Sequence, residues 1–349
     1  MRALITGITG FLGSHLAELM VTSGDEILGL ARCHTWPDHL AQNSALRDIP
    51  LAAWDLSGTV ASDVIPSATV DAIRHFRPDV IFHFAALSNP RDCGQITPNA
   101  LAVQINVDGV RSIVNLAAKM PNRPRFIFAS TAHVYARPTC GVRVHEESIL
   151  EPSRGYGMTK LAAERVLRTI AGDQQLDLVI GRSFQHAGPR QEPRLMLAEW
   201  ASQIAKNQPT PIRVHSLNTF IDVSDGRDAA RAYRELAEHG RPGRVYNIGS
   251  GTRQRTGDLL EMLQAIAGTQ REVIEANPGF GRNLIANIDR ITSETCWRPR
   301  IPVETTLHGA LVWWQSRIKS ASQAKTLPPD RRELSQHYAR LVDELDPKA

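Results

Sequence analysis

The feature that most constrains this chain is a glycine-rich turn close to its start. The residues Thr6-Gly7-Ile8-Thr9-Gly10-Phe11-Leu12-Gly13 follow a short apolar run and open a helical pattern. In a strand–turn–helix unit, such glycines let the backbone approach a pyrophosphate, and the helix N-terminus supplies free N–H groups. A purely structural glycine turn is the alternative. We expect a dinucleotide to be held here by Gly7, Thr9, Gly10, Phe11, Leu12 and Gly13.

Short apolar, β-branched runs alternate with longer helical patterns along most of the chain, which is typical of βαβ units and a parallel sheet. Strands are expected at 3–6, 26–31, 51–54, 79–84, 125–130, 176–182 and 244–248. Helices are expected at 11–22, 68–76, 98–119 and 156–172, where apolar residues recur every three or four positions. The predicted fold class is α/β, a Rossmann-type doubly wound parallel sheet with a smaller, discontinuous C-terminal substrate-binding lobe.

The chain of 349 residues exceeds the usual size of one hydrophobic core. Glycine and proline punctuate shorter elements from about residue 187, which indicates a second lobe built from separate segments. We assign residues 1–186 with 222–250 to the dinucleotide-binding domain and residues 187–221 with 251–318 to the lobe. Residues 319–349 form a C-terminal tail, with a charged helical pattern at 331–345.

Composition excludes several classes of function. Forty Lys+Arg against thirty-six Asp+Glu leave a net charge of +4 without a basic block, so nucleic acid is not an expected partner. No apolar run approaches the length of about twenty residues that spans a bilayer. The four cysteines are far apart in the sequence and indicate neither a metal site nor disulfides. We expect reduced thiols, no bound metal and a cytoplasmic location.

The residues after the second expected strand select the cofactor. The strand ends Gly29-Leu30-Ala31-Arg32 with no acidic residue, and His34 follows. An acidic residue would bind ribose hydroxyls, whereas an arginine accommodates a 2′-phosphate, so NADP(H) is favoured and NAD(H) remains possible. Asp55 closes the third strand and would bind adenine, or would act as an ordinary turn residue. Leu56 beside it is included in the cofactor site.

A tyrosine and a lysine stand four residues apart in Tyr156-Gly157-Met158-Thr159-Lys160, on one face of an expected helix. A neighbouring cation favours the phenolate, which would bring Tyr156 into working range, and Lys160 could also hold the nicotinamide ribose. A solvated pair is the alternative. Thr131, at the carboxyl end of the fifth strand, is placed to bind a substrate oxygen, or to satisfy the backbone.

These pieces together resemble the extended short-chain dehydrogenases/reductases, the NAD-dependent epimerase/dehydratase family, and cover about residues 1 to 318. Further matching motifs are His83-Phe84-Ala85-Ala86, Asn106-Val107 with Gly109, Arg182 to Pro189, Phe220 to Asp225 and Trp297-Arg298-Pro299. Within the family, the chain most resembles GDP-mannose 4,6-dehydratases and the related GDP-4-keto-6-deoxymannose reductases, and Val245 to Gly251 and Cys296 to Pro302 look particularly like the reductase branch.

The resemblance implies further site residues. It places Ala85, Ala86, Ser130, Ser183 and His186 at the cofactor, and Gln185 with the following lobe at a nucleotide-diphosphate sugar, with a GDP-sugar favoured. Ser88, Thr131, His133, Arg190 and Arg282 complete the expected substrate site. A homodimer through the helices at 98–119 and 156–172 is expected on the same ground.

Two departures bear on the reaction and the substrate. His133 stands where the dehydratases carry a glutamate that acts on the sugar, which favours plain carbonyl reduction, although an imidazole could serve as a base. Asn218-Thr219-Phe220 replaces the Arg-Asp-Phe of many relatives, so one bidentate phosphate contact is missing. Arg190 or Arg213 would have to compensate.

The predicted function is NADPH-dependent reduction of a nucleotide-linked 4-keto-6-deoxy sugar. Hydride goes to C4, Tyr156 donates the proton, Thr131 polarises the carbonyl oxygen and Lys160 tunes the tyrosine. One alternative is an epimerase or 4,6-dehydratase that recycles its NAD(P). Another is a non-catalytic NAD(P)-binding scaffold or sensor.

Overall fold

A seven-stranded parallel sheet forms the centre of the computed structural model, which describes residues 1–58, 64–137 and 143–325. Its strands are β1 (Arg2–Thr6), β2 (Glu26–Ala31), β3 (Leu51–Ala53), β4 (Val80–His83), β5 (Arg125–Thr131), β7 (Leu178–Ser183) and β12 (Val245–Ile248). Their spatial order is β12-β7-β5-β4-β1-β2-β3. The strand order reverses between β1 and β4, and ligands of open α/β sheets bind at such a switch point. The predicted fold class is confirmed.

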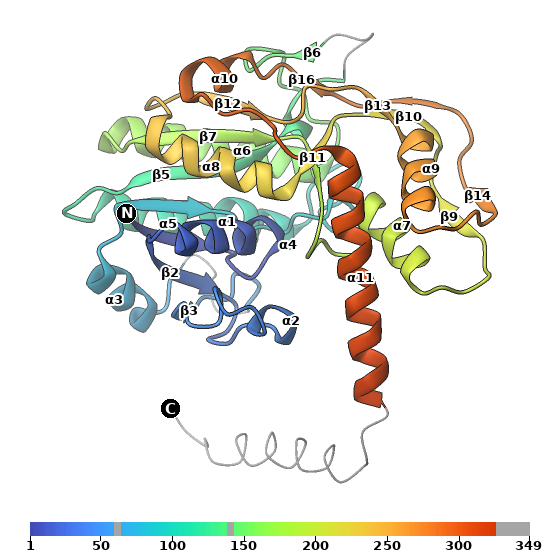
Figure 1. Cartoon of the computed structure of the whole chain (residues 1–349). Coiled ribbons are helices and arrows are strands. Elements are labelled where there is room, and N and C mark those ends of the chain that lie inside the picture. Colours follow the sequence, from blue (N-terminus) through green and yellow to red (C-terminus); the bar gives the residue numbers. More distant parts are fainter. Residues whose placement is uncertain (59–63, 138–142, 326–349) are drawn as a thin grey trace.

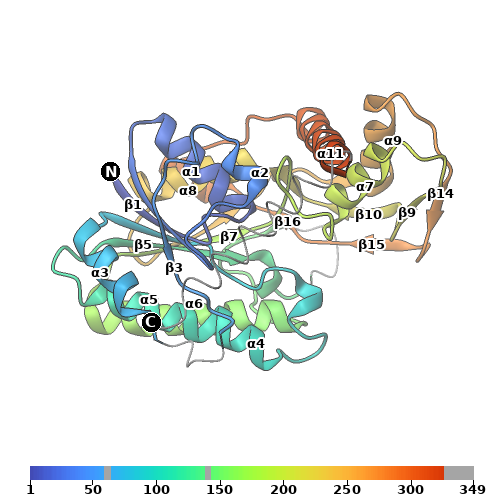
Figure 2. The same ribbon diagram turned by 90° about the horizontal axis from the view of Figure 1, so that it is seen from below.

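Helices cover both faces of the sheet, which explains why its strands are apolar on both sides. One face carries α1 (Phe11–Thr22), α8 (Gly226–His239) and α10 (Asp289–Thr295). The other carries α3 (Ser67–Phe76), α5 (Gly109–Ala118) and α6 (Gly155–Gln174). Figure 1 and Figure 2 show these two helical layers on either side of the strands. Short helices α2 (Asp38–Ala41) and α4 (Ala100–Val103) lie at the carboxyl edge of the sheet.

A second lobe sits beyond the carboxyl edge of the sheet (Figure 1). It contains α7 (Met196–Ala205), α9 (Thr256–Ile266) and the start of α11 (Val303–Lys325), packed around Trp200 and Leu260. One small sheet has the order β13 (Gln254–Arg255), β10 (Asn218–Ile221), β15 (Phe280–Arg282), and a second pairs β9 (Ile212–Val214) with β14 (Val273–Glu275). Two more pairs of strands lie near the boundary between the central sheet and the lobe. They are β8 (Gln185–Ala187) with β11 (Val223–Asp225), and β6 (Arg143–Val144) with β16 (Ile285–Ala286).

The helix predicted at 98–119 is wrong as a single element. It starts at Ala100, because the Asn99 side chain caps the amide of Ala102, and a π turn at Gln104–Asp108 separates α4 from α5. Interruptions of this kind are often found at functional sites. The physical cause is the amide of Asn106, whose hydrogen bonds are described below with the site.

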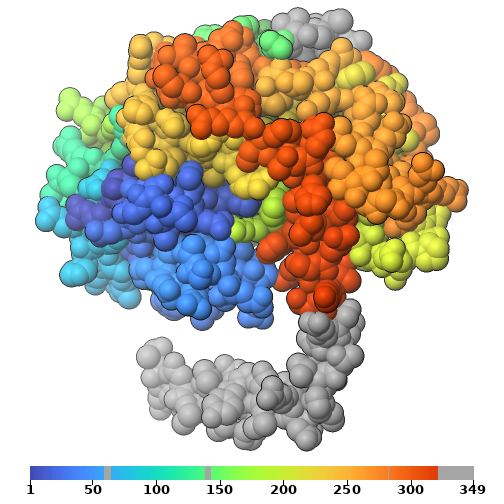
Figure 3. Space-filling model, in the orientation of Figure 1, coloured from blue at the N-terminus to red at the C-terminus, as the bar shows by residue number. Residues whose placement is uncertain are grey.

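The C-terminal third is shared between the two cores. Ile291 and Trp297, within the segment 251–318 that was assigned to the lobe, are buried against the central sheet, and the Trp297 indole donates to the Asp228 carbonyl at 3.0 Å. Helix α11 continues to Lys325, so the expected boundary at 318 falls inside it. Figure 3 shows α11, in red, lying across the surface between the N-terminal half and the lobe. Cys140 and the helical pattern at 331–345 lie outside the described residues.

Candidate active site

The glycine turn joins β1 to α1 at the switch point of the sheet. Gly7 has a φ of +66°, and a Cβ there would lie 2.7 Å from the Ala85 amide nitrogen. A Cβ on Gly13 would overlap the Gly7 carbonyl oxygen and the Cα of Ile8. Only glycine fits either position, so the turn and the start of α1 pack directly against each other and against the end of β4.

The N-terminus of α1 faces this turn without a side-chain cap. Gly10 is the N-cap residue, and the helix begins at Phe11. The first amide groups of a helix have no intrahelical partner, so they can bind an anion. Thr9 and Leu12 are half-buried beside them. The turn therefore fits a pyrophosphate, and the cofactor would supply the hydride.

The expected adenosine end lies beyond β2 and β3. Arg32 is exposed at the end of β2. Asp55 accepts hydrogen bonds from the Ser57 hydroxyl at 2.7 Å and the Ser57 amide at 2.9 Å, and these bonds, with a smaller contribution from Arg32, lower the pKa of its carboxyl group. Asp55 thus serves the turn after β3, the alternative left open by the sequence. Leu56 is buried, with its side chain against Gly109.

A polar contact fixes the end of β4. Thr6 Oγ1 lies 2.9 Å from His83 Nδ1 and accepts a hydrogen bond from the Ala85 amide at 3.1 Å. Burial lowers the pKa of His83 to about 3, so the imidazole is neutral. Ala85 and Ala86 follow it half-buried beside the glycine turn, where their small side chains leave room for a ligand.

Asn106 connects the loop after β4 to α6. Its side chain accepts from the Leu87 amide at 2.8 Å, donates to the Leu87 carbonyl at 3.1 Å and donates to Thr159 Oγ1 at 3.1 Å. The amide is fully buried in the π turn. It therefore holds the loop and α6 at a fixed separation. Ser88, the next residue of the loop, is exposed.

The expected catalytic residues come together. Thr131 ends β5 and Tyr156 lies in the first turn of α6, where the Thr131 side chain is close enough to lower the pKa of the phenol. Thr131 Oγ1 also accepts from the His133 amide at 3.3 Å. Lys160 is buried one turn further along α6, with its Nζ 4.3 Å from the centroid of the Phe128 ring.

Two glycines of α6 place Tyr156 between the loop after β4 and the end of β5. A Cβ on Gly155 would overlap the Cys93 carbonyl oxygen, and a Cβ on Gly157 would overlap the His133 carbonyl oxygen. The Cys93 thiol donates to the Leu87 carbonyl at 3.2 Å, and burial raises its pKa to about 11. The Cys93 thiol is thus an uncharged group beside the tyrosine. No motif in the sequence indicated this role for Cys93.

The expected tuning of the tyrosine by Lys160 stays a prediction, and burial acts on both groups in the structure. Burial raises the pKa of Tyr156 to about 12, and the hydrogen bond from Thr131 only partly opposes it. Burial also lowers the pKa of Lys160 to about 7, despite the charge of Glu164 one turn away. Desolvation of the ammonium thus brings its loss of charge close to neutral pH.

Behind the catalytic residues lies a buried ion pair that sequence reasoning missed. Glu164 on α6 accepts from Arg182 Nη2 at 2.7 Å, from Arg182 Nε at 3.0 Å and from the Ser130 hydroxyl at 2.5 Å. Both charged side chains are 2% exposed. Ser130 was expected at the cofactor, but its hydroxyl is committed to Glu164. The available signal was a glutamate four residues after Lys160 on the buried side of the helix.

The remaining expected residues line the space between β5 and the lobe. His133 is accessible to solvent and meets the Tyr156 ring edge to face, with centroids 5.7 Å apart. Ser183 Oγ lies 2.6 Å from the Tyr233 hydroxyl. His186 Nδ1 lies 2.9 Å from Ser224 Oγ, whereas its Nε2 is buried with no partner among the described residues. Gln185 is exposed.

The arginine expected to compensate for Asn218 is engaged elsewhere. Arg190 has a φ of +70° and donates to the Ser14 carbonyl at 3.1 Å and to Glu18 at 2.5 Å, so its guanidinium is held against α1. Arg282 lies on β15, where its backbone pairs with Phe220 of β10. The structure therefore does not bring Arg190 together with β10.

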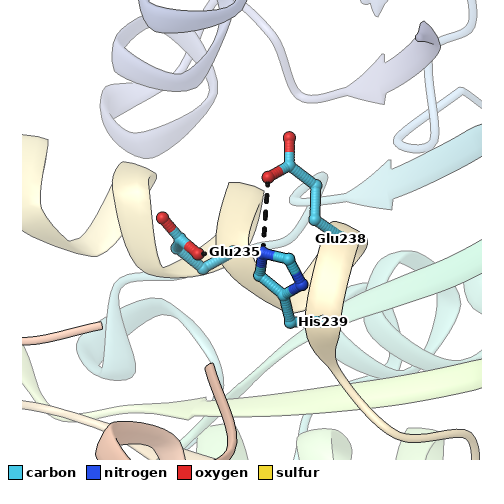
Figure 4. A group of neighbouring side chains, drawn as sticks. All are labelled: Glu235, Glu238 and His239. Atoms are coloured by element: carbon cyan, nitrogen blue, oxygen red, sulfur yellow. Dashed lines mark ion pairs between the residues drawn. The ribbon is translucent and has the colours of Figure 1, made fainter. Parts of the chain in front are cut away.

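One group of side chains in the described part of the chain has the spacing of a metal site. Glu235, Glu238 and His239 lie on the outer surface of α8 (Figure 4). His239 Nε2 is 3.7 Å from Glu235 and 3.8 Å from Glu238, and Arg234 contacts Glu238 at 3.2 Å. These are surface ion pairs within one helix. No helix of the described residues is long and apolar enough to cross a membrane.

A parallel sheet with a glycine turn after its first strand and a Thr/Tyr/Lys group at its carboxyl edge defines a Rossmann-type, NAD(P)-dependent enzyme. The family model "NAD dependent epimerase/dehydratase family" matches residues 3–249, more than half of the chain. The protein belongs to this family, and the predicted recognition and enzyme class are confirmed.

Curated relatives and solved structures agree with this assignment. GDP-6-deoxy-D-mannose reductase of Pseudomonas aeruginosa is 27% identical over 91% of this chain and 98% of its own length. dTDP-glucose 4,6-dehydratase of Streptomyces niveus is 26% identical over 95% and 99%. The structure of RMD from Pseudomonas aeruginosa complexed with NADPH has a TM-score of 0.72 and 25% identity, and covers 90% of this chain and 99% of that one.

Proposed function

We propose that the protein reduces the 4-keto group of a nucleotide-linked 4-keto-6-deoxy sugar, of the GDP-4-keto-6-deoxymannose type, with NADPH. The observation that carries the proposal is the buried phenol of Tyr156 beside Thr131 at the carboxyl end of β5, a phenol that is protonated at neutral pH. A neutral phenol with a proton to give suits reduction of a carbonyl. The similarity to a reductase, and to a structure with NADPH, supports the same reading.

The chain's own residues divide the work as follows. Thr131 and Tyr156 donate hydrogen bonds to the carbonyl oxygen of the substrate, and the C4 carbon accepts hydride from the reduced nicotinamide. As negative charge develops on that oxygen, Tyr156 transfers its phenolic proton to it, which completes the alcohol. Lys160, one turn further along α6 and with a pKa of about 7, returns a proton to the tyrosine between turnovers in this proposal.

The preference for NADPH is proposed from Arg32, which is exposed at the end of β2 where no acidic residue stands. An arginine there pairs with a 2′-phosphate. The unpartnered Nε2 of His186 and the small side chains of Ala85 and Ala86 fit the nicotinamide half of the cofactor.

His133 separates this proposal from a dehydratase but not from an epimerase, because epimerases also lack the carboxylate. It stands at the position where the GDP-mannose 4,6-dehydratases carry a glutamate. Desolvation by the surrounding protein, followed by the charges of Arg154 and Arg137, lowers the pKa of its imidazole. The side chain is thus neutral and supplies no carboxylate for elimination. Because the chain is also similar to dTDP-glucose 4,6-dehydratase, an enzyme that recycles its NAD(P) is one outcome of the test.

The test uses the purified full chain with NADPH and GDP-4-keto-6-deoxymannose, followed at 340 nm, with mass spectrometry of any dinucleotide released on denaturation. We expect one NADPH consumed per sugar reduced. Tyr156→Phe should abolish turnover while NADPH binding is retained, and Tyr246→Phe, whose hydroxyl contacts Glu294 at 2.7 Å away from the site, should be active. Tightly held NAD(P) with no net consumption would instead indicate an epimerase or dehydratase, and cofactor binding without turnover of any keto sugar would indicate a scaffold or sensor.

A homodimer is proposed through the surface of α4, α5 and α6, which lie side by side below the sheet in Figure 2. Leu101 on α4 and Leu150, just before α6, are exposed there at 42% and 37%. Light scattering on the full chain should give twice the mass of 38.5 kDa. A monomer at micromolar concentration would rule the dimer out.

A further inference from the structure

The outer face of the small sheet β13-β10-β15 carries side chains that the reaction site does not use. Ile221 of β10 is 1% exposed and points into the core of the lobe. Because side chains alternate along a strand, Asn218 and Phe220 point to the opposite face. Phe280 of β15 pairs with Asn218 in the register of the two strands and lies on this face as well. The face is thus open on the side away from the core.

Aromatic and cationic groups are stacked on this face. The Arg253 guanidinium carbon lies 3.6 Å from the centroid of the Phe220 ring. The rings of Phe220 and Phe280 have centroids 5.7 Å apart, and Phe280 is 53% exposed. We call the group of Asn218, Phe220, Phe280 and Arg253 the Phe220 platform. An arginine stacked on a ring is held in place, yet the N–H groups at its edge remain available.

Arg253 differs from its neighbours in having no carboxylate partner. No ion pair involves it within the described residues, whereas Arg255, two positions on, contacts Asp258 at 2.6 Å. Arg190 is likewise engaged, with Glu18. An exposed guanidinium that is oriented but uncompensated is suited to an anion, and its planar fork matches phosphate oxygens.

The platform is connected by a short stretch of chain to the reaction site. The Asn283 amide, just past β15, donates to the Phe220 carbonyl at 2.9 Å, and Ala286 of β16 packs with Ala132 and Val134. Those two residues flank His133. In Figure 2, β16 lies between the end of the central sheet and the strands β10 and β15. A ligand reaching from Tyr156 toward the lobe would meet the platform.

We infer that Arg253, held on Phe220, binds the diphosphate of the nucleotide substrate and takes the place of the arginine that Asn218 replaces. The inference rests on the proposed function, because it assumes a nucleoside-diphosphate substrate. The exposed Phe280 offers its ring to the nucleobase, and Asn218 adds an amide donor beside it. The contact to the phosphate thus comes from Arg253, immediately before β13, rather than from a residue of β10.

The test measures binding of GDP, UDP and dTDP by isothermal titration calorimetry to the full chain saturated with NADPH, so that it does not depend on turnover. Arg253→Gln should weaken the best-bound diphosphate about tenfold or more, which is the loss expected for a charge-assisted contact. Arg255→Gln, two positions further on and paired with Asp258, is the matched control and should change the affinity by less than about threefold. Asn218→Arg, added to Arg253→Gln, should restore at least half of the lost binding free energy.

The outcomes separate this inference from the proposed reaction. Unchanged affinity in Arg253→Gln overturns the inference, even if the protein reduces the keto sugar. An equal loss for the free nucleoside and for its diphosphate also overturns it, because a stacking contact alone would then explain the result. A selective loss of diphosphate affinity in a protein that reduces no keto sugar supports the inference and refutes the proposed function.

Discussion

The buried pair Glu164–Arg182 offers the sharpest prediction for stability. Glu164→Gln keeps the size of the side chain and removes its charge. The carboxylate accepts three hydrogen bonds, two from Arg182 and one from Ser130, and both members of the pair are 2% exposed. A glutamine retains one acceptor oxygen and turns its NH2 group toward donors. The Arg182 charge is then left buried without a counter-charge.

The expected loss follows from that geometry. Breaking a buried pair by removing one partner costs about 3–5 kcal/mol, because the remaining charge stays desolvated. The free energy of unfolding should therefore fall by this amount in urea titrations at pH 7, with an unchanged m-value. Far-ultraviolet circular dichroism and tryptophan fluorescence should give coincident transitions, since a chain with two cores can deviate from two-state behaviour.

A control and a double variant make the prediction specific. Asp108→Asn breaks the exposed pair with Arg111, also at 2.7 Å, and should cost less than about 1 kcal/mol. Replacing both Glu164 and Arg182 by methionine should recover most of the loss, because no buried charge remains. If Glu164→Gln costs no more than the exposed control, the pair is not desolvated as the structure shows, and the reasoning is refuted.

Three further predictions concern the cofactor turn and the catalytic lysine. Gly13→Ala should destabilise the protein by about 1–3 kcal/mol through overlap with the Gly7 carbonyl, whereas Gly172→Ala, with open space around it, should stabilise by about 0.5–1 kcal/mol; thermal unfolding measures both. Arg32→Gln should lower kcat/KM for NADPH about tenfold or more and leave that for NADH nearly unchanged, and equal effects on both would exclude a 2′-phosphate contact. Lys160 has a pKa of about 7 in the folded protein and 10.5 as its ordinary value, so between these pH values the unfolded chain binds more protons. Relative to Lys160→Met, the wild-type protein should gain up to about 1.4 kcal/mol of stability per pH unit across that window in urea titrations, and a constant difference would contradict the lowered pKa.

The fold was predictable because its signals are local. Runs of apolar residues about five long separated by helices specify a parallel sheet, and the expected strand 26–31 and helix 11–22 match β2 and α1 at both ends. The helix expected at 98–119 failed because its interruption depends on Asn106, whose amide bonds Leu87 and Thr159. Neither partner is near Asn106 in the sequence, so no periodicity argument could have found the π turn.

The site divides in the same way. The glycine turn, Thr131, Tyr156 and Lys160 were named from motifs whose spacing reflects the chemistry itself. The protonation of those groups was not predictable, because burial, which raises the pKa of Tyr156 and lowers that of Lys160, comes from the packing of α6 against two loops. Likewise, Arg190 is an arginine of the right kind near the lobe, but only the tertiary structure shows it bound to Glu18.

The charge states of the site favour one direction of reaction. A tyrosine held neutral by burial is a poor base for oxidising an alcohol but a ready acid for reducing a ketone. Because Lys160 is close to its pKa at neutral pH, binding of an anionic cofactor beside it would favour the ammonium form and, through it, the return of a proton to Tyr156. Binding of the cofactor would therefore increase the fraction of Lys160 that can return a proton to Tyr156. Titration of Lys160 in the free and the cofactor-bound protein, for example by nuclear magnetic resonance of 15N-labelled lysine, should show a higher pKa in the complex.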